Sequence, residues 1–310
     1  MTGWLRRGAA AASLAGNRGD LWPPGTLAWL VYLGWLPILL VVAPPSGDDL
    51  EYIGVSLITS GSYPANVIAL SVAAVAGFLL LCLLAAVGET ALFAALRRAP
   101  GLATSQTGLS ALAVVLLATV PVLIALAALV SGIIAAAPAA FTSPDVDTPV
   151  LLRLATALTP YLVGLLIALL VGQLFGGLAL RVAIREAGRG TADAIRQALR
   201  RIVRDPWGPL GVTVVALVKD LLLFAASYGL LRVLWTPIQA GLGAGPLASP
   251  TTLLLLVGLV VTWLALLLIG GALHVAISAW WLAELSPVEL QELHRAHGDE
   301  QPGPLGGHGT

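Results

Sequence analysis

The sequence predicts an all-α protein, built as a polytopic transmembrane helix bundle with six spans. Of its 310 residues, 58% are hydrophobic and 10% are charged, against roughly 25% charged in typical soluble proteins. Four stretches of 27 to 51 residues contain no charged side chain: 21–47, 52–88, 99–144 and 233–283. A helix that crosses a bilayer needs about 20 mainly apolar residues. Runs of this length therefore indicate membrane spans and exclude a water-soluble globular protein.

Composition and motif content exclude several other classes. The single cysteine, Cys82, excludes a disulfide scaffold, and the balance of 16 basic and 16 acidic residues excludes a nucleic-acid-binding protein. The sequence has no P-loop, no His-Glu-x-x-His and no Gly-x-Ser-x-Gly motif. His294 and His297 have no further ligands in their segment, so they predict no metal site. We expect neither an enzyme nor a cofactor.

Six apolar segments are long enough to cross the bilayer, at 26–42, 65–88, 109–137, 150–184, 210–235 and 252–282. The first ends at Pro44, the second continues as a helix to Arg98, and Pro138 closes the third. Residues 26–285 thus form the membrane domain. We expect a cytoplasmic arm with a short surface helix at 1–25 and a polar, partly disordered cytoplasmic tail at 286–310.

Loop charges predict how these spans are oriented. Thirteen of the 16 basic residues lie in or beside the N-terminal arm, the connections after spans two and four, and the tail. The other connections, 43–64, 138–149 and 236–251, contain no basic residue. Because cytoplasmic loops are enriched in Lys and Arg, we expect both termini to be cytoplasmic. The Ala-, Leu-, Gly- and Arg-rich composition, with one lysine, is typical of a bacterium, so we expect its inner membrane.

The six spans read as three helical hairpins with weak internal repetition. Spans two, four and six end in similar stretches, which begin at Gly88, Gly176 and Gly270. In this alignment Glu89, Arg181 and His274 occupy similar places near the inner ends of their spans. Two alternatives follow. These residues converge into a polar cluster under the inner leaflet, or they are unrelated interfacial residues and Glu89 pairs with Arg97 or Arg98.

Lys219 and Asp220 interrupt the fifth span near its middle. Lys219 is nine residues from Leu210, about 14 Å along a helix. Ionisable groups at that depth are costly and normally face a partner or water. Adjacent helical residues do not face each other, so we expect the two to have different partners. Three interpretations stay open: the pair lines a polar cavity, makes structural pairs that order the bundle, or reaches the interface on a shallow helix.

A basic amphipathic helix is predicted at 191–204, between spans four and five. Ile195, Leu199, Ile202 and Val203 form an apolar stripe at helical spacing, flanked by Arg196, Arg200, Arg201 and Arg204. Such a helix can place its apolar face among acyl chains and its arginines on anionic headgroups. Alternatively, the charges set the topology and the apolar face packs on neighbouring helices.

Two passages carry a resemblance to known proteins. They are Gly88-Glu89-Thr90-Ala91-Leu92 and Ala198-Leu199-Arg200-Arg201, the latter followed by Asp205-Pro206-Trp207. With the six-span layout, they resemble uncharacterised bacterial six-span membrane proteins, including the membrane region attached to some glycerophosphoryl diester phosphodiesterases. The resemblance implies a six-span fold over most of the chain. It implies no catalytic residues, because this chain has no phosphodiesterase catalytic domain.

The leading functional hypothesis is a non-enzymatic membrane scaffold or accessory protein that contacts membrane lipids, including anionic headgroups, and a protein partner in the membrane. The alternative is a transporter of a small solute, ion or lipid with a polar site at Lys219 and Asp220. The two differ in one structural feature. A transporter needs a cavity that reaches Lys219, whereas a scaffold buries this side chain in direct contacts.

Overall fold

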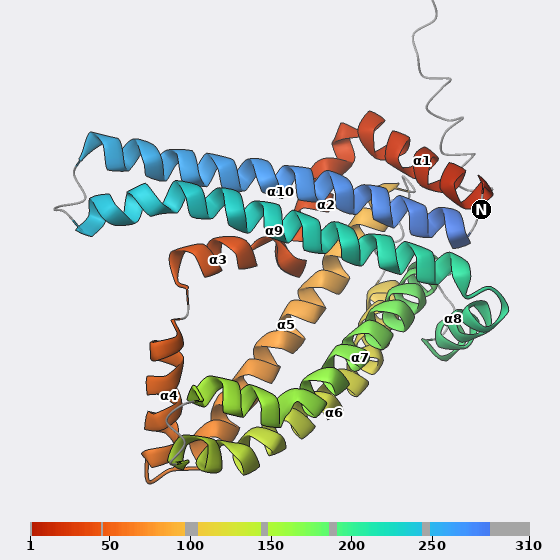
Figure 1. Ribbon diagram of the computed structural model, residues 1–310. Helices are drawn as coiled ribbons and strands as arrows, with labels where there is room; N and C mark the ends of the chain where they lie inside the picture. Colours follow the sequence, from red (N-terminus) through yellow and green to blue (C-terminus); the bar gives the residue numbers. More distant parts are fainter. Residues whose placement is uncertain are drawn as a thin grey trace, which may run out of the picture.

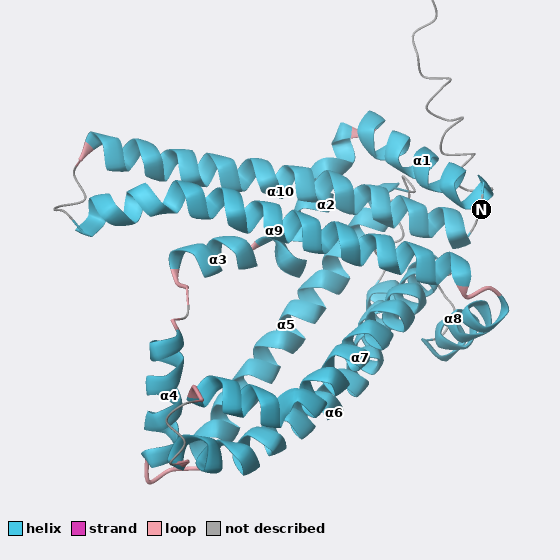
Figure 2. Cartoon of the chain, viewed as in Figure 1, coloured by secondary structure: helices cyan, strands magenta, loops and turns pink. Residues whose placement is uncertain are grey.

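The computed structural model describes residues 2–44, 46–96, 105–143, 148–185, 191–243 and 249–285. Every regular element in these ranges is helical (Figure 1 and Figure 2). Five helices are long and apolar enough to cross a membrane: α5 (Ala65–Leu96), α6 (Ser105–Thr142), α7 (Val150–Arg185), α9 (Trp207–Gly243) and α10 (Pro250–Leu285). The predicted all-α bundle of a multi-pass membrane protein is confirmed.

The predicted first span is a broken helix. It consists of α2 (Trp22–Trp29), a π-helical turn η2 (Leu30–Gly34) and α3 (Leu36–Val42), with a bend of 47° before α3. Pro37 lies in the first turn of α3 and has no N–H to donate to the carbonyl of Leu33, so a regular helix cannot continue through this point. If the segments on the two sides of this bend, Gly19–Gly34 and Leu36–Val42, are counted as one span, the total number of candidate spans is six.

The third span is longer than predicted, because α6 continues through Pro138 to Thr142. A proline inside a helix removes the hydrogen bond to the carbonyl four residues earlier, here that of Ile134. Tyr63 replaces the lost donor: its hydroxyl donates to the Ile134 carbonyl at 2.5 Å. The expectation that Pro138 closes the helix was therefore wrong, since a distant side chain satisfies the group that the proline leaves unpaired.

An additional helix, α4 (Gly47–Thr59), lies in the connection after the first span, which the sequence analysis did not predict as helical. Ser46 caps it, with its hydroxyl accepting from the backbone N–H of Asp49 at 2.9 Å. Asp48 and Asp49 lie in its first turn, where negative charge is favoured by the helix dipole. The acids of this connection therefore start a helix.

Consecutive spans pack in pairs: α2 on α5, α6 on α7, and α9 on α10. In Figure 1 the α6–α7 and α9–α10 hairpins approach each other at the end that carries α8 (Thr191–Arg204) and diverge toward the opposite end. We call this the α8 end; it holds the last turns of α5, α7 and α10. Two of the three predicted hairpins are seen, α6–α7 and α9–α10, whereas α2 packs on α10 as well as on α5. The sequence repeat itself stays a prediction.

The α8 end is tied together by arginines. Arg185 at the end of α7 donates to the carbonyl of Leu285 at 3.1 Å, and Arg201 on α8 donates to that of Glu284 at 2.9 Å. These are final carbonyls of α10, which have no partner within their helix and favour cations. On α1 (Thr2–Asn17), Arg7 makes two bonds to the Glu284 carboxylate, at 2.7 and 3.1 Å. Three helices thus converge on the end of α10.

The apolar stripe predicted for 191–204 does not lie on one buried face. Ala194 and Ala198 are buried against α7 and α6, whereas Leu199 and Val203 are 53% and 74% exposed. Ile195 and Ile202 are half-buried and pack against the same core as the two alanines. The predicted stripe is therefore divided: two of its residues pack on neighbouring helices, and Leu199 and Val203 face outward.

A charge-lined cavity between the hairpins

A cavity of about 360 Å³ lies where the two hairpins meet, with walls from α2, η2, α5, α6, α7, α9 and α10. Both polar sites proposed from the sequence line it. Glu89, Arg181 and His274 lie at its α8 end, and Lys219 and Asp220 lie further along α9. The structure therefore places five ionisable side chains from four helices around one space.

Glu89, Arg181 and His274 converge, which is the first of the two alternatives left open by the sequence. Glu89 Oε1 lies 2.6 Å from His274 Nε2 and 3.5 Å from Arg181 Nη2. Ser278 donates to Glu89 Oε2 at 3.3 Å. The other partners considered for Glu89, Arg97 and Arg98, lie outside the described residues.

Local sequence explains how these side chains reach one another. His274 and Ser278 are four residues apart on α10 and so share a face toward α5. Arg181 is held on α7 by a bond from Nη1 to the Gly177 carbonyl at 3.0 Å, with its guanidinium 5.1 Å from the Trp281 ring centre. Arg181 is therefore oriented before any ligand is present.

Lys219 and Asp220 contact each other, contrary to the expectation of separate partners. Lys219 Nζ lies 2.6 Å from Asp220 Oδ1, and the same ammonium lies 4.6 Å from the centre of the Trp29 ring. Helical spacing separates the two Cβ atoms, but the four-carbon lysine side chain bends back to the adjacent carboxylate. In apolar surroundings, the attraction between the ammonium and the nearest carboxylate outweighs the conformational cost of bending the lysine side chain back.

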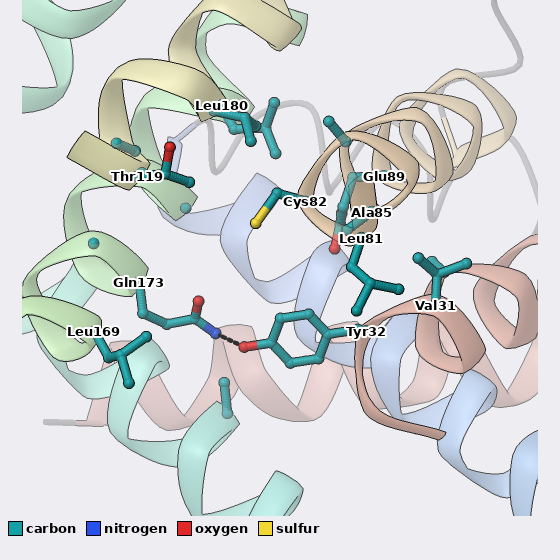
Figure 3. A pocket seen from close by; sticks show the side chains of 18 of the residues that line it. Val31, Tyr32, Leu81, Cys82, Ala85, Glu89, Thr119, Leu169, Gln173 and Leu180 are labelled. Carbon is teal, nitrogen blue, oxygen red and sulfur yellow. Dashed lines mark hydrogen bonds between the residues drawn. The ribbon is translucent and has the colours of Figure 1, made fainter. Parts of the chain in front are cut away.

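Aromatic rings connect the two charged groups. The Trp29 ring lies 6.4 Å from the Tyr32 ring, and Tyr32 lies 6.5 Å from the His274 ring. The amide of Gln173 on α7 donates to the Tyr32 hydroxyl, and Figure 3 shows the two side chains meeting across the cavity. Since Tyr32 belongs to the π-helical turn, the break in the first span delivers this ring to the site.

The sequence analysis assigned no role to Trp29, Tyr32, Gln173 or Ser278. Gln173 did carry a signal, because an amide within an apolar span is costly unless it finds a partner. Trp29 and Tyr32 carried none, since aromatic residues are common in membrane helices and their direction depends on η2. Ser278 is four residues from His274 and so lies on the same face of α10. That spacing predicts a role only once α5 is known to bring Glu89 to this face.

Two polar atoms of the cavity have no hydrogen-bond partner among the described residues. They are Arg181 Nε, a donor, and Asp220 Oδ1, an acceptor whose contact with Lys219 lacks hydrogen-bond geometry. Both side chains belong to residues that are more than nine-tenths buried. Asp220 Oδ1 is nevertheless paired with the Lys219 ammonium at 2.6 Å, so Arg181 Nε is the polar atom left unpaired, which costs about 1–3 kcal/mol. The arrangement can therefore accept a ligand that offers an acceptor to Arg181.

The arginines predicted to contact anionic lipid lie apart from this cavity. Arg196, Arg200 and Arg204 are exposed on α8, and Arg201 is bound to the Glu284 carbonyl. No group of three or more metal-ligating side chains occurs within the described ranges. The tail 286–310, including His294 and His297, lies outside them.

Comparisons with known proteins produced no match: no family model, no curated protein and no solved structure is similar to this chain. The resemblance to six-span proteins of the glycerophosphoryl diester phosphodiesterase type therefore stays a prediction. What the chain does must be argued from the cavity itself.

Proposed function

We propose that this membrane protein is a non-enzymatic transporter of a lipid-like, amphipathic solute, which binds in the central cavity with its polar head at the charged end. The observation that carries the proposal is the set of five ionisable side chains that four helices place in the wall of one cavity, among which Arg181 Nε has no hydrogen-bond partner in the described residues. A head group with an anionic oxygen and an ammonium or hydroxyl donor offers an acceptor to Arg181 and Lys219 and a donor to Asp220. Such a ligand supplies the hydrogen bond that Arg181 Nε lacks.

On α5 and α7 the cavity wall changes from charged to apolar with distance from the α8 end, which supports an amphipathic ligand. On α5 the lining runs from Glu89 at the α8 end to Phe78, and on α7 from Arg181 to Leu169. Eleven or twelve helical residues span about 16–18 Å. A polar head beside Glu89 and Arg181 therefore leaves room for an acyl chain along Phe78 and Leu169.

The broken first span also supports transport. Discontinuous helices line the substrate sites of many secondary transporters, because irregular backbone is tolerated in a membrane where it borders a cavity. Here Val31 and Tyr32 of η2 line the cavity beside the bend. A hinge of this kind can move Tyr32 and Trp29 relative to α10 when a ligand enters.

The position of Lys219 favours transport over the scaffold hypothesis. A scaffold was expected to bury this side chain entirely in direct contacts. Lys219 does contact Asp220 and Trp29, but it also lines the cavity. An ion pair that borders a cavity can open toward a charged ligand, because the ligand replaces one partner as the other is released.

A binding measurement on Lys219→Met tests the proposal. The probe is lysophosphatidylethanolamine, which has a phosphate, an ammonium and one acyl chain, titrated into the purified full chain and followed by native mass spectrometry. Losing one charge-assisted hydrogen bond costs about 1.5–3 kcal/mol, which corresponds to about tenfold weaker binding or more. Arg232→Met removes one positive charge from the same helix outside the cavity and is expected to change binding less than twofold.

Transport is read in proteoliposomes that contain the same lysolipid labelled on its acyl chain with a dithionite-reducible fluorophore. The parent protein and Arg232→Met are expected to speed the loss of fluorescence from the inner leaflet, and Lys219→Met to slow it toward the protein-free rate. Equal rates for both variants would contradict the proposal. So would tighter binding of a simple fatty acid and an alkylamine, which each carry only one of the two charges of the proposed head group.

We also propose that the α8 end faces the cytoplasm of a bacterial cell. The support is the charge distribution, because the connections at this end carry most of the arginines. In a chain with Cys82→Ser, Leu199→Cys is expected to react with an impermeant maleimide only after the cells are opened. Asp145→Cys is expected to react in intact cells, and the reverse pattern would refute this orientation.

A further inference from the structure

A second hollow at the α8 end has four arginines among its seven lining residues. This basic pocket, about 300 Å³ in volume, is formed by the ends of α7 and α10 and by one face of α8. Its lining residues are Val182, Arg185, Gln197, Arg200, Arg201, Arg204 and Leu285. None of these is acidic, and guanidinium groups keep their charge at any physiological pH. The pocket thus concentrates four positive charges in a small space.

The pocket is rigidly built on two sides. Ala194 and Ala198 seat α8 against α7 and α6, and Arg201 and Arg185 are anchored by their bonds to the last carbonyls of α10. The nearest described carboxylate on α10, that of Glu284, is bound by Arg7. The structure therefore holds Arg200 and Arg204 beside these anchored arginines without an ion pair to an acid of the described chain.

Arg200 and Arg204 supply the groups that a ligand can use. They lie four residues apart on α8, so they share one face, and both are exposed with no ion pair in the described part of the chain. Planar guanidinium groups bind phosphate oxygens with two parallel hydrogen bonds. Two such groups beside the anchored Arg201 match the several oxygens of one phosphate.

We propose that the basic pocket binds the phosphate group of an anionic phospholipid. A lipid source is favoured over free phosphate because exposed apolar side chains neighbour the pocket's arginines along α8 and at the start of α9. Leu199 and Val203 alternate with its arginines on α8, and Trp207 at the start of α9 is 77% exposed. Exposed aliphatic groups and a tryptophan at the end of a span are typical of a surface in contact with the membrane interface.

This site is independent of the central cavity and does not rest on the transport proposal. It also differs from the diffuse lipid contact expected from the sequence. Arg185 joins the set and Arg196 leaves it, because Arg196 lies on α8 outside the pocket. That difference supplies a matched control, since Arg196→Gln and Arg200→Gln remove the same charge from the same helix.

The test measures binding of short-chain phosphatidylglycerol to the purified full chain in neutral detergent, by native mass spectrometry. Arg200→Gln and Arg204→Gln are each expected to weaken binding at least fivefold, and Arg196→Gln less than twofold. Both substituted side chains are exposed, so the fold is expected to remain intact. Equal losses for all three variants would overturn the proposal, because they would indicate diffuse electrostatic attraction.

Two further arms decide the source of the anion. Inorganic phosphate is expected to compete only at concentrations at least a hundredfold above those of the lipid; equal potency would overturn the lipid assignment in favour of free phosphate. A full-length chain in which Glu289, Glu292, Asp299 and Glu300 are replaced by Gln or Asn lacks the acids of residues 286–310, and it is expected to bind the lipid within twofold of the parent. Binding seen only in this variant would overturn the proposal, since the acids of the chain's own tail would then occupy the pocket.

Discussion

Glu89→Gln is expected to lower the free energy of unfolding by about 3–5 kcal/mol, one of the two largest effects that the structure predicts. The substitution keeps the shape of the side chain but removes the charge that faces Arg181 and His274. Breaking a buried ion pair at one partner leaves the other charge uncompensated, which costs this amount. Unfolding in mixed micelles of dodecyl sulfate and maltoside, followed by tryptophan fluorescence, measures the change.

The double variant Glu89→Gln with Arg181→Met separates charge compensation from packing. Removing both charges is expected to recover most of the lost stability, because apolar replacement of a buried pair is often neutral or favourable. Asp193→Asn, an exposed acid in the first turn of α8, is the control and is expected to change stability by less than about 1 kcal/mol, the size of a helix-dipole effect. A double variant no more stable than Glu89→Gln would show that the pair does not act as a unit.

Gly271→Ala is expected to cost about 2–3 kcal/mol of unfolding free energy, although it adds one methyl group. A Cβ at this position would lie 2.5 Å from the backbone nitrogen and 2.6 Å from the Cα of Thr26. Backbone atoms cannot rotate away as a side chain can, so α2 must move off α10. Gly25 faces the same crossing, where its own Cβ would lie 2.7 Å from the Gly271 carbonyl oxygen.

Gly258→Ala provides the matched control on the same helix. A Cβ there meets no atom within 4 Å, so the alanine is expected to leave stability unchanged or to raise it by up to about 1 kcal/mol through helix propensity. The same micelle unfolding assay compares the two variants. If Gly271→Ala were as stable as Gly258→Ala, α2 and α10 would not be in the close contact that positions Trp29 and Tyr32.

Much of the candidate site could be anticipated from residue type alone. Lys219, Asp220 and Glu89 stand out because a charged side chain in an apolar segment is costly and therefore needs a local reason. Their partners could not be assigned in the same way. Glu89 had Arg97 and Arg98 close by in sequence, yet its contacts in the structure are His274 and Arg181, 185 and 92 residues away. In a bundle of several helices, closeness in the sequence does not identify which charged side chains contact each other.

The basic pocket is a second case in which the sequence identified the residues but not their contacts. The arginines of α8 were evident from the sequence, but their division into separate roles was not. Arg201 caps α10, Arg200 and Arg204 face the pocket, and Arg196 does neither. Rotation of α8 about its axis decides this, and the burial of Ala194 and Ala198 sets that rotation. Of the larger apolar residues that the periodicity favoured, Ile195 and Ile202 pack against the core, whereas Leu199 and Val203 are exposed.

The amino-acid sequence by itself determined that this chain is helical, that it suits a membrane, and where its apolar segments lie. Those properties are local: the bilayer sets the length and polarity of a span, and each helix satisfies its own backbone. Only the tertiary structure decided that Pro138 stays within a helix, that the first span bends at η2, and that two charged groups share one cavity. These depend on contacts between distant segments, such as the Tyr63 hydroxyl on the Ile134 carbonyl, whose energy no single segment contains.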